Sequence, residues 1–138
     1  MSAGLSGRVL DATAISDIAI GRSIYAAAFL AAANDVGIAL ALPAAALQEA
    51  WAEADPEDYP FLDLLLGLPL TILDPLDAEA ASRSGILARD VHAASAFDAG
   101  AAQAVLSAQD RNWPVLTVDP APLRAIDPGL PIETLPAP

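Results

Sequence analysis

The sequence predicts a single α/β domain with a mostly parallel central sheet of four to five strands flanked by helices. Short apolar runs alternate with helical patterns along the whole chain, and no internal repeat or shift in composition divides it. Strands that alternate with helices of 10–15 residues form βαβ units, which build parallel sheets covered by helices. A length of 138 residues suits one domain, so residues 1–138 are expected to form one unit with a core over about 8–135.

Helix caps and chain breakers place the elements of the first half of the chain. Ser23 is a favoured N-cap, and Gly21 and Gly37 follow helical patterns where glycine ends a helix at little cost. Pro43 is tolerated in a first helical turn. In order, these signals predict strand 8–11, helix 13–20, helix 24–36, strand 38–42, helix 44–54, a short helix 61–66 and strand 70–73.

The second half of the chain repeats the alternation with longer helices. Its apolar residues recur at helical spacing in two stretches before the next strand-like run. In order, the pattern predicts helix 77–89, helix 94–109, strand 115–118, a helical turn over 121–126 and an edge strand 132–135.

The charge balance limits the classes of partner. Eighteen acidic residues against six arginines and no lysine give a formal net charge of −12. Nonspecific nucleic-acid binders usually present a basic face that neutralises many phosphates, and this chain has too few cations for a large one. Either the partner is not nucleic acid, or metal ions and a few arginines act locally. Arg22 and Arg89 are the candidates for phosphate contact, with isolated solvated arginines as the alternative.

Cysteine content and hydropathy predict the compartment. The absence of cysteine excludes a disulfide framework, a thiolate zinc site and a cysteine nucleophile. The longest stretch free of charge is Val36–Gln48, which has thirteen residues and contains Pro43. A spanning helix needs about 20 apolar residues. With no signal-peptide pattern at the N-terminus, we expect a cytoplasmic protein without a membrane segment.

Acidic residues follow the predicted strands. Asp11 ends the first strand, Asp119 follows the fourth, Asp98 lies near the helix before it, and Glu49 lies in the helix after the second. Because ligands of parallel α/β sheets bind outside the carboxyl ends of the strands, these acids are expected at one crevice. Carboxylates gathered there stay ionised together only with a cation among them. Oxygen ligands without His or Cys suit Mg²⁺ or Mn²⁺.

Two hydroxyl side chains flank the acids at the strand ends. Thr13 lies two residues after Asp11, and Thr117 lies two residues before Asp119. We predict that these threonines fix a water molecule or a phosphate oxygen at the same crevice.

Four short motifs resemble those of the PIN-domain family, in the same order. Val9–Ala14 looks like the opening strand with Asp-x-Ser/Thr/Asn, and Leu47–Ala50 like the central glutamate on a helix. Phe97–Ala102 matches Asp-Ala-x-x-Ala-Ala, and Leu116–Asp119 is similar to the closing Thr-x-Asp. The successive acids are 38, 49 and 21 residues apart, which fits the family, and the resemblance covers about residues 8–135.

The resemblance implies a function as well as a fold. Small PIN proteins of this length are mostly the toxins of VapBC-type toxin–antitoxin modules, which are Mg²⁺- or Mn²⁺-dependent endoribonucleases. They form homodimers and are silenced by a small antitoxin protein. The resemblance assigns Asp11, Glu49, Asp98 and Asp119 to the metal cluster, with Asp11 and Asp98 central. The implied reaction is hydrolysis of an RNA phosphodiester, in which bound ions activate water and hold the departing oxygen.

Each acid also has a structural interpretation. Asp11, Asp98 and Asp119 are of a residue type favoured at helix N-caps and turns. Glu49 lies off the apolar stripe of its helix, where a solvated glutamate is the ordinary case.

Two other functions stay open. The first is a catalytically inactive PIN-like module that binds a protein partner; the acidic balance favours it, because two divalent ions would change the net charge only from −12 to −8. The second is a receiver-like phosphotransferase on a doubly wound sheet. That chemistry usually needs a lysine near the phosphate, and the chain has none.

Overall fold

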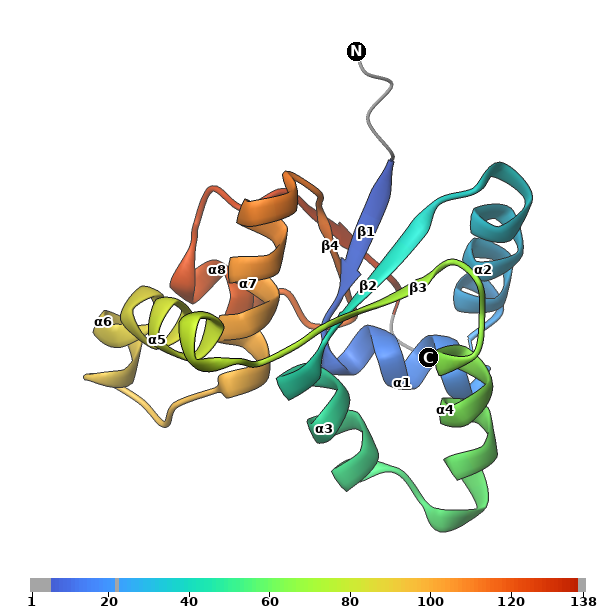
Figure 1. The fold of residues 1–138 in the computed structure, drawn as a ribbon, viewed down its shortest axis with the longest axis horizontal. Helices are drawn as coiled ribbons and strands as arrows, with labels where there is room; N and C mark the ends of the chain where they lie inside the picture. The colour runs from blue at the N-terminus through green and yellow to red at the C-terminus, as the bar shows by residue number, and fades with distance from the viewer. Residues whose placement is uncertain (1–5, 22, 137–138) are drawn as a thin grey trace.

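The computed structural model describes residues 6–21 and 23–136, in which five strands alternate with helices (Figure 1). The strands are β1 (Gly7–Leu10), β2 (Ala39–Pro43), β3 (Thr71–Asp74), β4 (Val115–Thr117) and β5 (Ile132–Thr134). The helices are α1 (Ala12–Ile20), α2 (Ile24–Val36), α3 (Ala44–Glu53), α4 (Tyr59–Leu66), α5 (Ala78–Leu87), α6 (Arg89–His92), α7 (Ala99–Arg111) and α8 (Ala121–Ile126), with a 3-10 turn at Pro56–Asp58.

The strands form one sheet in the order β3-β2-β1-β4-β5, and every neighbouring pair is parallel. Val9 of β1 lies between Ala41 of β2 and Val115 of β4. From β1 the chain builds outward to β3 and then returns to the other side of β1, so the strand order reverses between β1 and β4. In doubly wound sheets, ligands bind outside the carboxyl ends of the strands at such a reversal.

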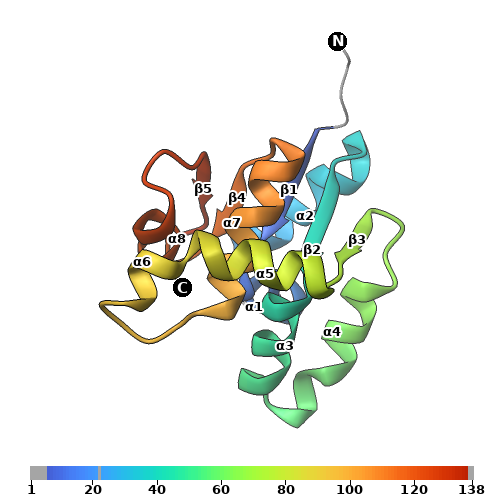
Figure 2. The same ribbon diagram turned by 60° about the vertical axis from the view of Figure 1, so that its left-hand side comes forward.

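Helices cover both faces of the sheet (Figures 1 and 2). Helices α1, α2 and α4 pack on one face, and α7 and α8 pack on the other. Helix α5 lies outside α7, and α3 contacts both α1 and α7 at the carboxyl end of the strands. The predicted α/β class with a mostly parallel sheet is confirmed.

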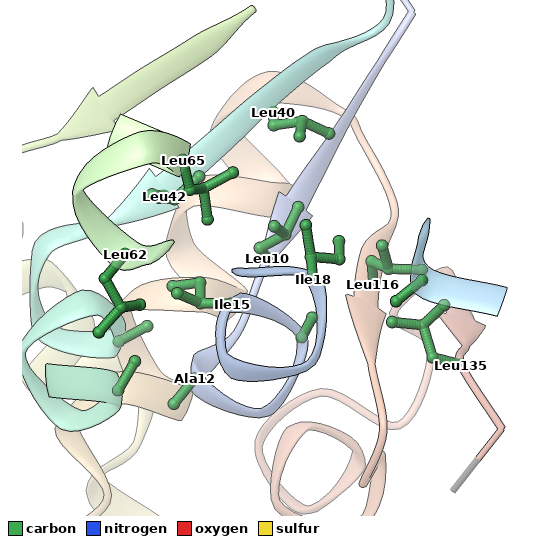
Figure 3. Packing of buried hydrophobic residues seen from close by; sticks show 14 residues of the cluster. Leu10, Ala12, Ile15, Ile18, Leu40, Leu42, Leu62, Leu65, Leu116 and Leu135 are labelled. Carbon is green, nitrogen blue, oxygen red and sulfur yellow. The ribbon is translucent and has the colours of Figure 1, made fainter. Parts of the chain in front are cut away.

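Two apolar clusters hold these layers together. Figure 3 shows the first, in which Leu10, Leu40 and Leu42 of the sheet meet Ile15 of α1 and Leu62 of α4. The second cluster uses alternate strand residues on the opposite face of the sheet, with α7 and α8 against it. Side chains of a strand alternate between its two faces. A central strand that is covered on both sides is therefore apolar along its length.

Helices α1 and α2 are short and meet at a bend of 88°. Among the described residues, no single helix is long and apolar enough to cross a membrane, and only this bent pair reaches the necessary length and composition when both helices are counted together. In the structure both helices bury apolar side chains against the domain, including Ile15 and Ile18 of α1 and Ala26 of α2.

One predicted element is wrong in its boundaries. The helix expected over 94–109 begins only at Ala99, and the preceding residues form a short helix, α6, followed by a loop. The alanines of this loop suit a helix, but Asp98 has an extended backbone, and its side chain accepts a hydrogen bond from the Ala101 amide. Asp98 therefore starts a new helix instead of continuing an old one.

Candidate functional site

A pocket of about 120 Å³ lies at the carboxyl ends of β1 and β4, where the strand order reverses. Asp11, Glu49, Asp98 and Asp119 all line it. They come from four parts of the chain: the end of β1, the middle of α3, the start of α7 and the turn after β4. The structure thus brings together all four acids that the sequence singles out. We call this pocket the acidic pocket.

Asp11 is the most buried of the four acids, with a relative exposure of 7%. It is the N-cap of α1, and its Oδ1 accepts hydrogen bonds from the Ala14 amide at 3.0 Å and from the Thr13 hydroxyl at 2.7 Å. Its Oδ2 accepts a hydrogen bond from the Thr117 hydroxyl. Burial raises the pKa of Asp11 above its ordinary value of 3.8, and these hydrogen bonds act in the opposite direction.

The two threonines hold Asp11, and the prediction that they fix a water molecule or a phosphate oxygen gains no support. An ionised carboxylate only accepts hydrogen bonds, so the single proton of each hydroxyl is directed to Asp11. The hydroxyl oxygens in turn accept hydrogen bonds from backbone amides. Thr13 Oγ1 accepts the Val118 N–H at 2.9 Å, and Thr117 Oγ1 accepts the Asp119 N–H at 3.0 Å. Both hydroxyl protons are therefore already used within the fold.

Glu49 lies on the side of α3 that faces the acidic pocket and is half-buried. Burial raises its pKa, and the negative charges of Asp98, Glu53 and Asp11 raise it further. Gly100 permits this arrangement, because a Cβ there would lie 3.3 Å from both Ala46 Cα and Glu49 Oε1. Helices α3 and α7 can therefore approach closely enough to place Glu49 beside the start of α7.

Asp98 and Asp119 are the exposed members of the pocket. Asp98 is the N-cap of α7, and its Oδ1 accepts the Ala101 amide at 3.0 Å. Asp119 precedes α8, and its Oδ1 accepts the Ala121 amide at 3.4 Å. The cap and turn interpretations of Asp11, Asp98 and Asp119 are therefore correct, and the same three residues line the pocket. The two interpretations do not exclude each other.

The four acids line one pocket, but their side chains are not arranged to coordinate one metal ion. Over residues 6–21 and 23–136, no three acidic or histidine side chains are placed to hold one metal ion. Each aspartate turns an oxygen toward a local donor, and like charges at one crevice repel. The chemistry of the donor set still fits a hard divalent cation, because it consists of carboxylate oxygens without His or Cys.

Gln103 is a residue of this region that sequence reasoning missed. It is 1% exposed, and its Oε1 accepts the Ala45 amide at 2.8 Å. Its Nε2 donates to the carbonyls of Asp74 at 3.0 Å and Pro75 at 3.1 Å. Gln103 thus joins α7 to the first turn of α3 and to the end of β3. The one sequence signal for this role was that Gln103 carries a side-chain amide among the small residues on the buried side of α7.

Of the two arginines predicted to contact phosphate, Arg89 does not line the acidic pocket. Arg89 is exposed on α6, and Arg22 lies outside the described residues. Both tryptophans pack against other described residues: Trp51 stacks at a tilt on Tyr59, and Trp113 packs against Gly7. Trp113 also carries the Arg111 guanidinium 5.0 Å above its ring.

No protein-family model and no curated protein matches this sequence. Its fold is similar to a chain in the crystal structure of VapBC2 from Rickettsia felis bound to a DNA fragment from their promoter, with a TM-score of 0.65 and 13% identity over 93% of this chain and 98% of that one. A chain of FitAcB from Neisseria gonorrhoeae has a TM-score of 0.61 and 18% identity over 90% and 94%. The predicted PIN-like fold is thereby confirmed.

Proposed function

We propose that this chain is a Mg²⁺- or Mn²⁺-dependent endoribonuclease and the toxin of a toxin–antitoxin pair. The observation that carries the proposal is the convergence of Asp11, Glu49, Asp98 and Asp119 on one pocket at the reversal of strand order. The likeness of fold to chains of VapBC2 and FitAcB supports it. The proposal includes a small antitoxin protein as partner, a homodimer and a cytoplasmic location.

The same four acids would hold the divalent ion. A cation in the acidic pocket would offset the repulsion that raises the pKa of Glu49. When bound, such ions activate water and stabilise the departing oxygen of a phosphodiester. Thr13 and Thr117 orient the Asp11 carboxylate, and Gln103 and Gly100 fix the distance between the helices that carry Glu49 and Asp98.

Cleavage of RNA by the Asp98→Asn variant tests the proposal. Asparagine is also a favoured N-cap, so α7 is expected to keep its start while the pocket loses a charge. We expect cleavage with Mg²⁺ or Mn²⁺ to fall about 100-fold or more, as when one electrostatic stabiliser is removed from an active site. Asp63→Asn, which removes an exposed charge on α4, is the matched control and should cleave like the parent. A parent chain that cleaves no RNA with either ion contradicts the proposal.

A catalytically inactive PIN-like module that binds a protein is the second candidate. Two observations favour it: the described acids form no three-residue metal cluster, and the net charge is −12. Following thermal unfolding while Mn²⁺ is added separates the two functions. A nuclease site should add about 2.7 kcal/mol of stability at 100 times the dissociation constant, and Asp98→Asn should remove most of that gain. No stabilisation of the parent favours the inactive module.

A further inference from the structure

An apolar hollow of about 270 Å³ lies beside the acidic pocket. Its walls come from α6, the loop before α7 and α8, and we call it the α6–α8 hollow. Val91, Phe97, Ala125 and Ile126 supply most of its apolar lining. Asp98 and Pro122 line both the hollow and the acidic pocket, so the two adjoin each other. A ligand that extends across these two residues would contact both.

The cations that form no ion pair within the described chain lie on the helices that wall this hollow. Arg8, Arg83 and Arg111 are each paired with a carboxylate, at Glu133, Asp110 and Asp74 respectively. Arg89 of α6 and Arg124 of α8 are exposed and take part in none of these pairs. In a chain of net charge −12, the two described arginines without an ion pair are therefore carried by two helices that wall one apolar hollow.

An aromatic ring is exposed at the edge of the hollow nearest the acids. Phe97 is 44% exposed and directly precedes Asp98. The His92 ring contacts it edge-on, with the ring centroids 5.7 Å apart and an interplanar angle of 83°. Single-stranded nucleic acids are bound by exposed aromatic rings, on which bases stack, together with flanking cations, which contact phosphates. Phe97, Arg89 and Arg124 supply both.

We propose that the α6–α8 hollow binds a nucleobase of single-stranded RNA, next to the phosphodiester that enters the acidic pocket. This inference rests on the proposed function. The base stacks on Phe97, the backbone crosses Asp98 and Pro122, and the flanking phosphates face Arg89 and Arg124. Without lysine or a basic face, affinity has to come from such base contacts more than from phosphate neutralisation. A protein segment in the hollow is the alternative occupant, and it has no need of these cations.

The test measures RNA binding apart from cleavage. The full chain is titrated, without divalent ions, into a fluorescently labelled single-stranded oligoribonucleotide, and anisotropy gives the dissociation constant. We expect Phe97→Ala to weaken binding about 5-fold to 150-fold, the factor for a base-stacking contact of about 1–3 kcal/mol. Phe61→Ala is the matched control, because Phe61 on α4 is 45% exposed, and it should bind like the parent.

A second variant tests the cations. Arg124→Gln should weaken binding to every sequence by a similar factor and flatten the dependence of affinity on salt by about one phosphate contact. Arg83→Gln makes the same change of charge on α5, and we expect it to leave the slope unchanged. If the affinity of the two variants for RNA depends on salt with the same slope, Arg124 is not a phosphate contact.

The outcomes separate this inference from the proposed function. If Phe97→Ala binds RNA like the parent while the parent cleaves RNA, the hollow is not a base subsite and the nuclease stands. If Phe97→Ala loses binding but no RNA is cleaved with either ion, the subsite stands and the nuclease fails. If it binds RNA normally but no longer forms a complex with a co-expressed protein partner, the hollow belongs to that protein and the inference is wrong.

Discussion

Two strand ends in the same sheet carry an aspartate in different electrostatic settings. At the end of β3, Asp74 accepts hydrogen bonds from Nε and Nη2 of Arg111, whose guanidinium also lies on Trp113. At the end of β1, Asp11 accepts only neutral donors, from Thr13, Thr117 and the Ala14 amide. One negative charge is balanced by an ion pair inside the fold, and the other is held in place by neutral donors among the described residues.

The difference separates a structural acid from a candidate ligand. The hydrogen bonds that Arg111 donates to Asp74 raise the pKa of Arg111, as expected for a cation that meets its partner. Burial raises the pKa of Asp11, as expected for an anion kept from water without a counter-charge. The β3 end is therefore stabilised by an ion pair within the fold, whereas at the β1 end the described partners of Asp11 are neutral hydrogen-bond donors.

Removing the amide that anchors the β3 end should have the largest effect. Gln103→Leu leaves three backbone groups without their partner, and each orphaned group costs about 1–3 kcal/mol. We expect a loss of about 3 kcal/mol or more in the free energy of unfolding, measured by urea denaturation. Gln109→Leu changes an exposed glutamine of the same helix and should cost less than about 0.5 kcal/mol. Similar losses for the two variants would contradict the role of Gln103.

Breaking the ion pair at the β3 end should be the next largest effect. Asp74→Ala removes both hydrogen bonds to Arg111, which are partly buried. We expect a loss of about 1.5–3 kcal/mol in unfolding free energy. Asp110→Ala breaks the exposed pair with Arg83 and should cost clearly less, because solvent screens an exposed ion pair. If the two variants lose the same free energy of unfolding, the pair between Asp74 and Arg111 stabilises the fold no more than the exposed pair does.

At the β1 end, the comparable change is Thr117→Val. It keeps the volume but leaves the Asp11 Oδ2 and the Asp119 amide without their hydroxyl partner. We expect a loss of about 1–3 kcal/mol. Thr134→Val on β5 is the control, because Thr134 is exposed. Unchanged stability of Thr117→Val would mean that the hydroxyl does not hold Asp11.

The smallest effect should be a gain in stability. The folded state raises the pKa of Glu49 above its ordinary value of 4.5, so the charged form of Glu49 destabilises the fold at neutral pH. Glu49→Gln also removes the i, i+4 repulsion with Glu53, worth about 0.2–0.5 kcal/mol, and should unfold at higher denaturant than the parent at pH 7.

The pH dependence of the stability difference between Glu49→Gln and the parent tests whether the fold raises the pKa of Glu49. The penalty appears as pH rises through the raised pKa and is absent once Glu49 is protonated in both states. The advantage of Glu49→Gln should therefore shrink as pH is lowered from 7 through the raised pKa toward the ordinary value of 4.5. Glu57→Gln, at an exposed position, should show no such trend. An advantage that grows at lower pH would contradict the raised pKa.

Most helices and strands of the fold could be predicted from local signals in the sequence. Ser23 caps α2 through its side chain, and Gly21 and Gly37 adopt the left-handed conformation that ends α1 and α2. All five predicted strands are present, and the last of them is at an edge of the sheet. These features were predictable because caps, turns and apolar runs depend on neighbours a few residues away.

The errors arise where the deciding partner is distant in sequence or where two local signals compete. The start of α7 was missed because the alanines before Asp98 favour a helix while Asp98 itself starts a new one. The bonds that Thr13 and Thr117, 104 residues apart, both donate to Asp11 were not predicted, whereas their contact with a water molecule or a phosphate oxygen stays a prediction. Gln103 was missed because its partner Ala45 lies 58 residues away.

The sequence alone was enough to predict the fold class, the absence of a large basic face and the four acids, because residue type, spacing and charge are properties of the chain itself. Only the folded structure shows that these acids line one pocket, that the described hydrogen-bond donors to Asp11 are neutral, and that α6 and α8, which carry Arg89 and Arg124, wall an apolar hollow beside it. The reason is that a parallel sheet brings distant strand ends to one edge, and side-chain directions there depend on contacts between segments far apart in sequence.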